Sequence, residues 1–554
     1  MLELTALAVL TAAWLVPNHY PPWSSFYNES AAALGLALLA ASVGRRWVRS
    51  RIGSTAGVVA LIALIPAAQW LGGRIDFFGD ALISSLYIFG FAAAIAVGEM
   101  WAQTNARLAA TRLSAALLIG SLISANLAMI QTLDPFNLGI YGLDTFRGMR
   151  AYANLGQPNN LATLIAMGSV GLLVLYEARR LGPLTSAVLA FVLLLGISLT
   201  QSRMALIFGP LFLAFMLVAK SRGLHLRTPV SAIAIATGSH WAMTFTWPLL
   251  QKALMLLPTA TLAERGIESV RLQMWPMLLD AATQRPWAGY GWLHVGEAEL
   301  AVADAYPPVG ELWLHGHNLF VELIVWSGFP IGIALSGLAI YWFASRLIAI
   351  DSLESAAGML VVAVVGTHAL LELPYHYAYF LIPVGLWIGQ VESRRAASRR
   401  IEARWLLPPT VLAAVLLLGI WRDYPAVEDD FRLVRFENLR IGTLRSTALA
   451  PEAPLLTGLT EFLGFTRTLP AAGMSQAALD RMSAVVRRTP YSAAMLRYAI
   501  ALSLNGRLAE ARTLMVKARH IHGEANYAAL RRDLRDRIQE GQSLLVGLYA
   551  VMPE

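Results

Sequence analysis

Long apolar runs recur along most of the chain, and short polar stretches rich in arginine separate them. Each run of roughly 15 to 25 residues is long enough to cross the hydrocarbon core of a bilayer as a helix. The alternating ten-residue segments of a membrane β-barrel do not occur. We therefore expect an all-α, polytopic helical membrane protein. Its thirteen candidate spans lie near residues 3–17, 30–44, 54–72, 81–101, 113–131, 161–177, 184–199, 204–219, 230–250, 318–345, 356–373, 377–390 and 406–420.

Lysine and arginine are unevenly divided between the two alternating sets of loops. The set that includes residues 45–51, 179–180 and 394–404 carries more than twice as many of these residues as the opposite set, although the opposite loops are much longer. Cytoplasmic loops carry the excess of positive charge in membrane proteins. We therefore expect the N-terminus in the cytoplasm and the long loops 132–160 and 251–317 on the outer face.

The hydrophobic pattern also predicts two domains. Residues 1–420 form the polytopic membrane domain, and residues 421–554 form a small helical domain on the outer face. Within the second domain, residues 491–523 have helical periodicity with a turn at 505–511, which is typical of one TPR-like hairpin. Two interpretations remain open for this domain: a cap that docks on the membrane domain, or a platform for a protein partner.

Composition supports the membrane class and excludes other functions. The chain is 57% hydrophobic and only 14% charged, whereas soluble domains have about 25% charged residues. The net charge of +8 could indicate a nucleic-acid partner, but the positive residues lie mostly at the ends of the spans. Topology explains them, so we expect no nucleic acid. The absence of cysteine excludes a disulfide framework and thiolate chemistry.

The outer face collects unusual arginines. Arg147 and Arg150 are three residues apart, Arg203 is tightly flanked by two apolar runs, and Arg265 and Arg271 lie in the loop 251–317. Guanidinium groups suit a phosphate or pyrophosphate. The alternatives are side chains that snorkel to the lipid headgroups in the first three cases, and local ion pairs on an exposed helix in the last two.

Other polar residues lie at the outer ends of the spans, where placing a polar group costs free energy. Their presence there therefore needs a structural or functional explanation. Gln157 belongs to the turn "GQPNN" and either caps the next helix or takes part in a site. His368 and Glu372 are four residues apart, which places them on one helix face. The glycine-rich and aromatic segment "RPWAGYGW", 285–292, lies at the membrane surface or closes over a sugar.

The segment "WLHGHNLFVEL", 313–323, contains two histidines, His315 and His317, at the start of a span. An H-x-H pair resembles half of a metal site, but a metal needs more ligands, and no HExxH motif is present. Two interfacial histidines without chemistry are another possibility. We favour a general base, since histidine is the usual group for removing a proton from a hydroxyl near neutral pH.

Four segments together resemble a known family. "HNLFVELIVWSGFPIG", 317–332, resembles the H-[NSQ]-x9-G signature of the bacterial O-antigen ligase and Wzy polymerase superfamily, with His317, Asn318 and Gly328 in the motif. The other three segments are similar to the PglL-type O-oligosaccharyltransferases. They are "VPNHYPPWSSFYNE" (16–29), "RAYANLGQPNNLAT" (150–163) and "ELPYHYAYFLIP" (372–383).

The resemblance implies a glycosyltransferase of the bacterial inner membrane with its active site facing the periplasm. It would move a preassembled oligosaccharide from undecaprenyl pyrophosphate to Ser or Thr of exported proteins such as pilin, with no cofactor and no metal. A single base without a carboxylate nucleophile suggests direct displacement with inversion. The same donor chemistry also fits an O-antigen ligase acting on lipid A–core, or a glycan polymerase. A transporter would show inverted repeats, and none is convincing.

The resemblance also assigns roles to individual residues. His317 matches the family histidine taken to be catalytic, and Gln157 and Tyr377 match positions tied to activity. The role of His315, which is outside the motif, stays open. The residues expected near the donor pyrophosphate are Arg203, Arg265, Arg271, Arg150 and Arg147.

Overall fold

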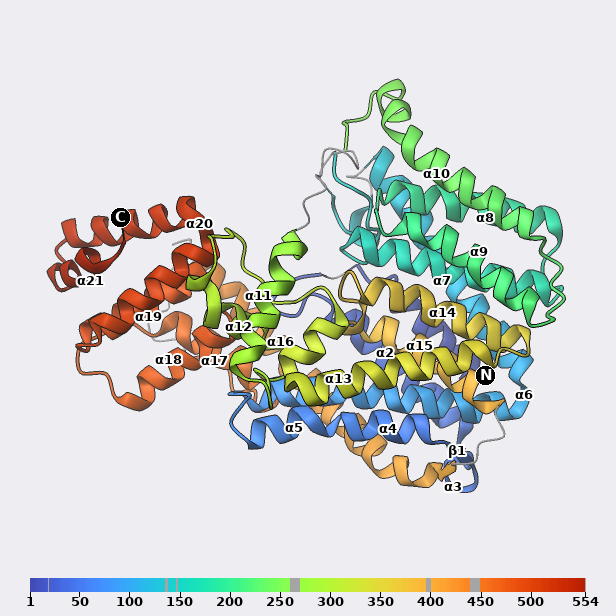
Figure 1. Ribbon diagram of the computed structural model, residues 1–554, viewed down its shortest axis with the longest axis horizontal. Helices are drawn as coiled ribbons and strands as arrows, with labels where there is room; N and C mark the ends of the chain where they lie inside the picture. The colour runs from blue at the N-terminus through green and yellow to red at the C-terminus, as the bar shows by residue number, and fades with distance from the viewer. Residues whose placement is uncertain are drawn as a thin grey trace. The chain divides into compact units, whose positions relative to one another are not determined.

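The computed structural model describes residues 1–17, 19–134, 138–145, 148–259, 270–394, 400–438 and 449–553. Nearly all regular elements of these residues are helices (Figure 1). Two three-residue strands, β1 (Arg51–Gly53) and β2 (Arg400–Glu402), pair antiparallel. The expected all-α class is therefore confirmed.

Among the described residues, six helices are long and apolar enough to cross a membrane, and five shorter apolar helices accompany them. One of the six, α6 (Phe78–Leu133), comprises two of the expected spans. They meet at Asn105, which adopts an extended conformation (φ −162°, ψ 93°). The polytopic membrane character is thus confirmed. The six segments are Phe26–Val43, Ser54–Leu71, Phe78–Leu133, Pro158–Glu177, Leu319–Ile348 and Ala403–Glu437.

The chain forms two compact units, and the first comprises Met1–Ala63, Leu86–Glu268 and Leu338–Val415. Helices distant in sequence pack as neighbours in this unit: α2 packs against α15, and α14 packs against α7 (Figure 1). The consecutive helices α14 and α15, and α7 and α8, also pack together, and α8 contacts α10. Its helices are α1 (Leu2–Ala12), α2 (Phe26–Val43), α3 (Arg46–Arg49), α4 (Ser54–Ile62), α7 (Pro158–Glu177), α8 (Pro183–Leu199), α9 (Ala205–Ser221), α10 (Val230–Ala253), α14 (Leu353–Ala369) and α15 (Ala378–Ser393).

Two glycines let α6 and α15 approach closely. A Cβ atom on Gly389 would lie 2.2 Å from the Ile95 carbonyl oxygen, and one on Gly98 would lie 2.3 Å from the Leu386 carbonyl oxygen. Helices in a membrane gain little from hydrophobic burial, so they associate through close packing of small residues. The two glycines therefore fix the distance between these helices.

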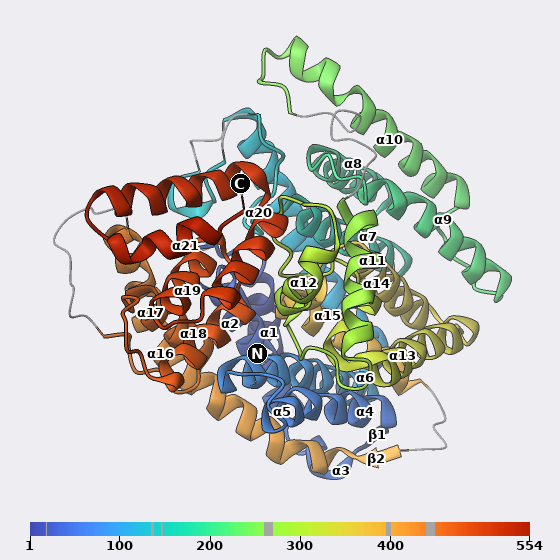
Figure 2. The same ribbon diagram turned by 60° about the vertical axis from the view of Figure 1, so that its left-hand side comes forward.

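The second unit comprises Leu64–Ser85, Ser269–Gly337 and Leu416–Glu554. Its C-terminal helices gather around a hairpin of α19 and α20 with a turn at Asn505, so the expected hairpin is present (Figure 2). The complete helices of this unit are α5 (Leu64–Leu71), α11 (Val270–Gln284), α12 (Val295–Val302), α17 (Thr457–Arg467), α18 (Gln476–Arg488), α19 (Ser492–Leu504), α20 (Leu508–Gln539) and α21 (Val546–Val551). Three longer helices contribute to both units: α6, α13 (Leu319–Ile348) and α16 (Leu407–Asn438).

Within the second unit, ion pairs join the C-terminal helices to a much earlier part of the chain. Arg487 binds Asp76 at 2.9 Å and Arg488 binds Asp80 at 2.7 Å. Lys517 donates to the carbonyl oxygens of Leu300 and Ala301 at 2.9 and 3.0 Å. The C-terminal helices thus pack on α12 and on the start of α6 with the residue Asp76 before it. The division of the chain at residue 420 stays a prediction.

Candidate active site

The first segment of α13 is delimited by residues of the H-[NSQ]-x9-G pattern. The Asn318 side-chain oxygen accepts hydrogen bonds from the backbone N–H groups of Phe320 and Val321 at 3.0 and 3.2 Å, which caps the first turn. Ten residues after Asn318, Gly328 interrupts the helix with φ 77° and ψ 171°. Only glycine adopts this backbone region readily. The asparagine and the glycine of the pattern therefore have separate structural tasks.

Segment 285–292 lies across the interruption. The interruption removes helical hydrogen bonds, and this segment replaces them: the Val325 carbonyl accepts from the Tyr290 N–H at 2.8 Å, and the Trp326 carbonyl accepts from the Gly291 N–H at 3.1 Å. In return, Phe329 N–H donates to the Pro286 carbonyl at 2.8 Å. We call residues 285–292 the strap. The strap packs against α13 and supplies hydrogen-bond partners for the backbone groups of α13 at the break.

Gln69 of α5 completes this arrangement. Its Nε2 donates to the Trp326 carbonyl at 2.7 Å, and its Oε1 accepts from the Trp292 N–H at 3.0 Å. The side chain is buried, so both bonds replace contacts with water. Sequence reasoning missed this residue. The available signal was a lone glutamine inside an apolar run, where a polar group is costly.

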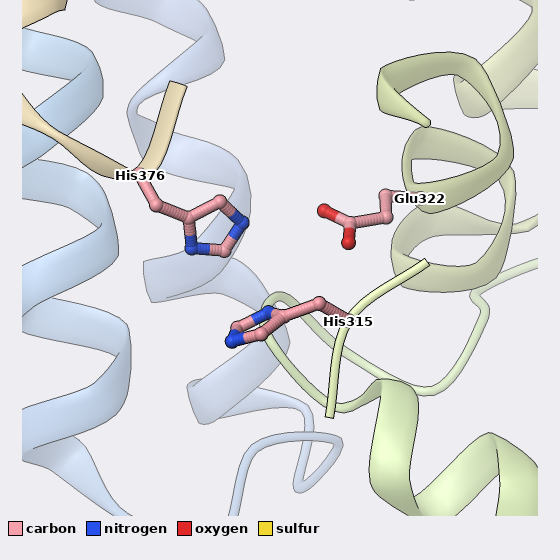
Figure 3. A group of neighbouring side chains, drawn as sticks. All are labelled: His315, Glu322 and His376. Carbon is pink, nitrogen blue, oxygen red and sulfur yellow. The ribbon is translucent and has the colours of Figure 1, made fainter. Parts of the chain in front are cut away.

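The loop before α13 is held from two sides and carries the candidate base. Glu322, fully buried, accepts from the Gly316 N–H, and the Gly316 carbonyl accepts from Trp275 Nε1 of α11 at 2.8 Å. Figure 3 shows Glu322 reaching out from α13 and His315 reaching out from this loop. His317 follows with φ 49°, a left-handed conformation that is uncommon outside glycine. The half-buried His317 thus sits at a strained position between two anchored neighbours.

A second buried carboxyl supports the same loop. Glu299 of α12 accepts from the Trp313 N–H at 2.7 Å, at the point where the histidine segment begins. Burial raises the pKa of Glu299 to about 8, so its carboxyl is mostly protonated at neutral pH. A neutral acid can remain buried here without an ionic partner.

A polar network in the first unit surrounds the candidate Arg150. Its Nε donates to the Thr200 carbonyl at 2.8 Å, and its Nη2 lies 3.4 Å from the Asn159 side-chain oxygen. That oxygen also accepts from the Ser202 hydroxyl at 2.6 Å, and Asn159 Nδ2 donates to Glu372 Oε1 at 3.1 Å. Asn159 therefore links three parts of the chain, a role that its place in "GQPNN" did not indicate.

The next residues of α7 connect Gln157 with the aromatic end of α15. Gln157 is the N-cap, and its side-chain oxygen accepts from the Asn160 N–H at 3.2 Å. Asn160 Nδ2 donates to the Tyr379 hydroxyl at 3.3 Å, and the rings of Tyr377 and Tyr379 stack at 5.0 Å. The cap is thus one role of Gln157, and the contacts through Asn160 and Tyr379 join Gln157 with Tyr377.

The N-terminal motif segment packs on the same loop. His19 Nε2 donates to the Asn154 carbonyl at 2.6 Å, while Asn154 Nδ2 donates to the carbonyls of Leu15 and Tyr141 at 2.7 and 2.9 Å. Burial lowers the pKa of His19, which favours the neutral ring. Segments 16–29 and 150–163, separate in the sequence, therefore form one surface.

The expected site residues fall into three groups. The first unit contains Arg150, Gln157 and Tyr377 in the described network, with the exposed Arg203 directly after Ser202. The second unit contains His317, His315 and the half-buried Arg271 at the start of α11. His376, also drawn in Figure 3, belongs to the first unit. Arg147 and Arg265 lie outside the described residues.

Comparison with known proteins agrees with the motif. The family model "O-Antigen ligase" matches residues 187–336, which include the whole pattern from His317 to Gly328, and "Virulence factor membrane-bound polymerase, C-terminal" matches residues 356–535. A general O-oligosaccharyltransferase of Acinetobacter baylyi is 29% identical over 94% of this chain and 92% of the relative. The chain is similar to the PglL-type O-oligosaccharyltransferases over nearly its whole length. The resemblance drawn from the sequence is thereby confirmed.

A further relative, a ComP-specific O-oligosaccharyltransferase of the same organism, is 28% identical over 70% of each chain. Both relatives are named for oligosaccharide transfer, which supports the expected class of membrane-bound transferase.

Gly328→Ala should destabilise the interrupted helix α13. A Cβ atom there would lie 2.5 Å from the Pro286 carbonyl oxygen, and the residue would keep an unfavourable φ. We expect a loss of about 1–3 kcal/mol or more in the free energy of unfolding. Thermal unfolding in detergent measures this loss. Gly337→Ala in the same helix meets open space and is the matched control. Equal melting temperatures for the two variants would contradict the role of the break.

Proposed function

We propose that the protein transfers a preassembled oligosaccharide from undecaprenyl pyrophosphate to Ser or Thr hydroxyls of exported proteins such as pilin. The reaction would take place on the periplasmic side of the bacterial inner membrane. The observation that carries this proposal is the H-[NSQ]-x9-G pattern built as a capped and braced helix with His317 at its entrance. The names of the two relatives support the protein acceptor.

His317 would act as the general base. A serine or threonine hydroxyl is a poor nucleophile until its proton is removed. As the imidazole takes this proton, the hydroxyl oxygen bonds to C1 of the first sugar, and the bond from C1 to the pyrophosphate oxygen breaks. Direct attack from the opposite face inverts the anomeric carbon. The anchored loop would hold the imidazole in place for this step.

The arginines would stabilise the leaving group. Negative charge grows on the lipid pyrophosphate as its bond to C1 breaks, and fixed guanidinium groups lower the free energy of that transition state. Arg150 is supported by the Thr200 carbonyl and Asn159, so it is already oriented. Gln157 and Tyr377 would orient the acceptor or the pyrophosphate. Arg203, Arg271, Arg147 and Arg265 are the further candidates for the pyrophosphate.

His317→Ala should lower the rate of glycan transfer by about a hundredfold or more, because a general base typically contributes that much. The assay uses membranes, a lipid-linked donor and purified pilin. His225→Ala, an exposed histidine outside the site, is the control. A wild-type rate for His317→Ala would remove the proposed base.

A second candidate function is O-antigen ligation, which the match to the ligase family model favours. The same assay with lipid A–core as acceptor distinguishes ligation from protein glycosylation. Transfer by the wild type to lipid A–core but not to pilin would replace the protein acceptor in the proposal. Transfer to neither acceptor, from a donor that a known ligase accepts, would contradict both functions.

Arg150→Gln should slow transfer roughly hundredfold even at saturating acceptor, because removing one preorganised donor to a developing charge has an effect of this order. Arg222→Gln makes the same change of charge at an exposed position outside the network and should keep the wild-type rate. If Arg150→Gln raised only the KM for the acceptor, the guanidinium would not act on the leaving group.

Transfer by the wild type should persist in EDTA, because the proposed step needs a base and fixed cations from the protein alone. The measurement compares initial rates with and without the chelator after prolonged preincubation. A loss of activity that Zn²⁺ or Mg²⁺ restores would contradict a metal-independent reaction.

A further inference from the structure

The first unit contains a polar cavity of about 200 Å³ at the C-terminal end of α7, the helix whose N-cap is Gln157. Two places where helical structure stops form this cavity. One is the break at Asn105 in α6, and the other is the turn after α7, which ends at Glu177. Three arginines line the cavity together with Asn105 and Thr111: Arg107, Arg179 and Arg180.

Local hydrogen bonds fix the backbone on the α6 side. Asn105 Oδ1 accepts from the Leu108 N–H at 2.9 Å, which starts the helix again after the break. The Thr111 hydroxyl donates to the Arg107 carbonyl at 2.6 Å. Arg107 therefore projects from an ordered first turn.

The α7 side is a tight helix-ending turn. Arg179 N–H donates to the Tyr176 carbonyl at 3.0 Å, and Arg180 N–H donates to the Leu175 carbonyl at 2.9 Å. Arg179 has φ 59°, at a position where glycine is the usual residue. An arginine thus occupies a turn position that glycine would adopt at lower cost, and its side chain lines the cavity.

Among the described residues, the three guanidinium groups have no carboxylate within salt-bridge distance, whereas the nearby Arg112 binds Glu3 at 2.6 Å. The adjacent Glu177 is occupied elsewhere: it accepts from the backbone N–H groups at positions 227 and 228, both at 2.8 Å. The cavity therefore concentrates positive charge without neutralising it.

Such a cavity suits a phosphate group. Guanidinium forks bind phosphate oxygens with paired hydrogen bonds. Basic pockets between membrane helices recognise lipid headgroups, and the cavity is smaller than the roughly 300–1,000 Å³ typical of sites for larger ligands. The three arginines also lie in loops expected to face the cytoplasm, where anionic lipid is accessible.

We propose that this cavity binds the phosphate headgroup of an anionic phospholipid. The wild type is reconstituted in nanodiscs of phosphatidylcholine with a small fraction of phosphatidylglycerol, and lipid that remains bound is counted by native mass spectrometry. The triple variant R107Q/R179Q/R180Q should hold phosphatidylglycerol at least tenfold more weakly, with an unchanged glycan-transfer rate.

The matched control is R45Q/R46Q/R49Q, which loses the same charge in a loop expected on the same face and does not line the cavity. Equal loss of lipid in both triple variants would show general attraction to the bilayer and overturn the site. Unchanged lipid binding in the cavity variant would also overturn it. Melting temperatures of all three proteins identify any failure to fold, and single Arg→Gln variants then replace the triple variant.

A second arm separates the two sources of phosphate. Inorganic phosphate and glycerol 3-phosphate are titrated into the wild type in neutral detergent, and the melting temperature is followed. We expect only a small rise, because the lipid chains supply part of the binding. Saturable binding of free phosphate together with no preference for phosphatidylglycerol would assign the cavity to a soluble phosphate compound and overturn the lipid proposal.

Discussion

A helix interrupted inside an apolar segment must find new partners for its freed backbone groups, and α13 meets this requirement at Gly328. Unpaired carbonyls in such surroundings cost several kcal/mol each, so the break exists only because the strap and Gln69 supply donors. The glycines of the strap and of α13 allow the two backbones to touch. The segment that begins at His317 is consequently held at its far end by hydrogen bonds and at its near end by the Asn318 cap.

The polar network around Asn159 follows the same rule in the first unit. Its hydrogen bonds join different segments: Arg150 binds Thr200, Asn159 binds Ser202 and Glu372, and Asn160 binds Tyr379. Because these bonds cross between segments, removing one partner leaves another without its bond. A network of this kind holds Arg150 and Gln157 in defined places before any ligand arrives.

Much of the fold could be predicted because its signals are local. Apolar runs predicted the helices, the turn at 505–511 predicted the α19–α20 hairpin, and the H-[NSQ]-x9-G pattern pointed to the family. The partners in the candidate site could not be predicted, since they depend on contacts between distant residues. Gln69 meets Trp326 across 257 positions, and Asn159 meets Glu372 across 213. No periodicity encodes such pairs. The break at Asn105 was anticipated as a loop between two spans. The break at Gly328 lay inside one expected span, although Gly328 and Pro330 are both residues that interrupt helices.

The ion pairs of Arg487 and Arg488 with Asp76 and Asp80 have a consequence for biosynthesis. The unit that carries His317 combines residues 64–85 and 269–337 with the last part of the chain. A ribosome makes the aspartates some four hundred residues before it makes their arginines. This unit can therefore close only when translation is nearly finished, and a chain that stops early leaves the histidine loop without the helices that complete its unit.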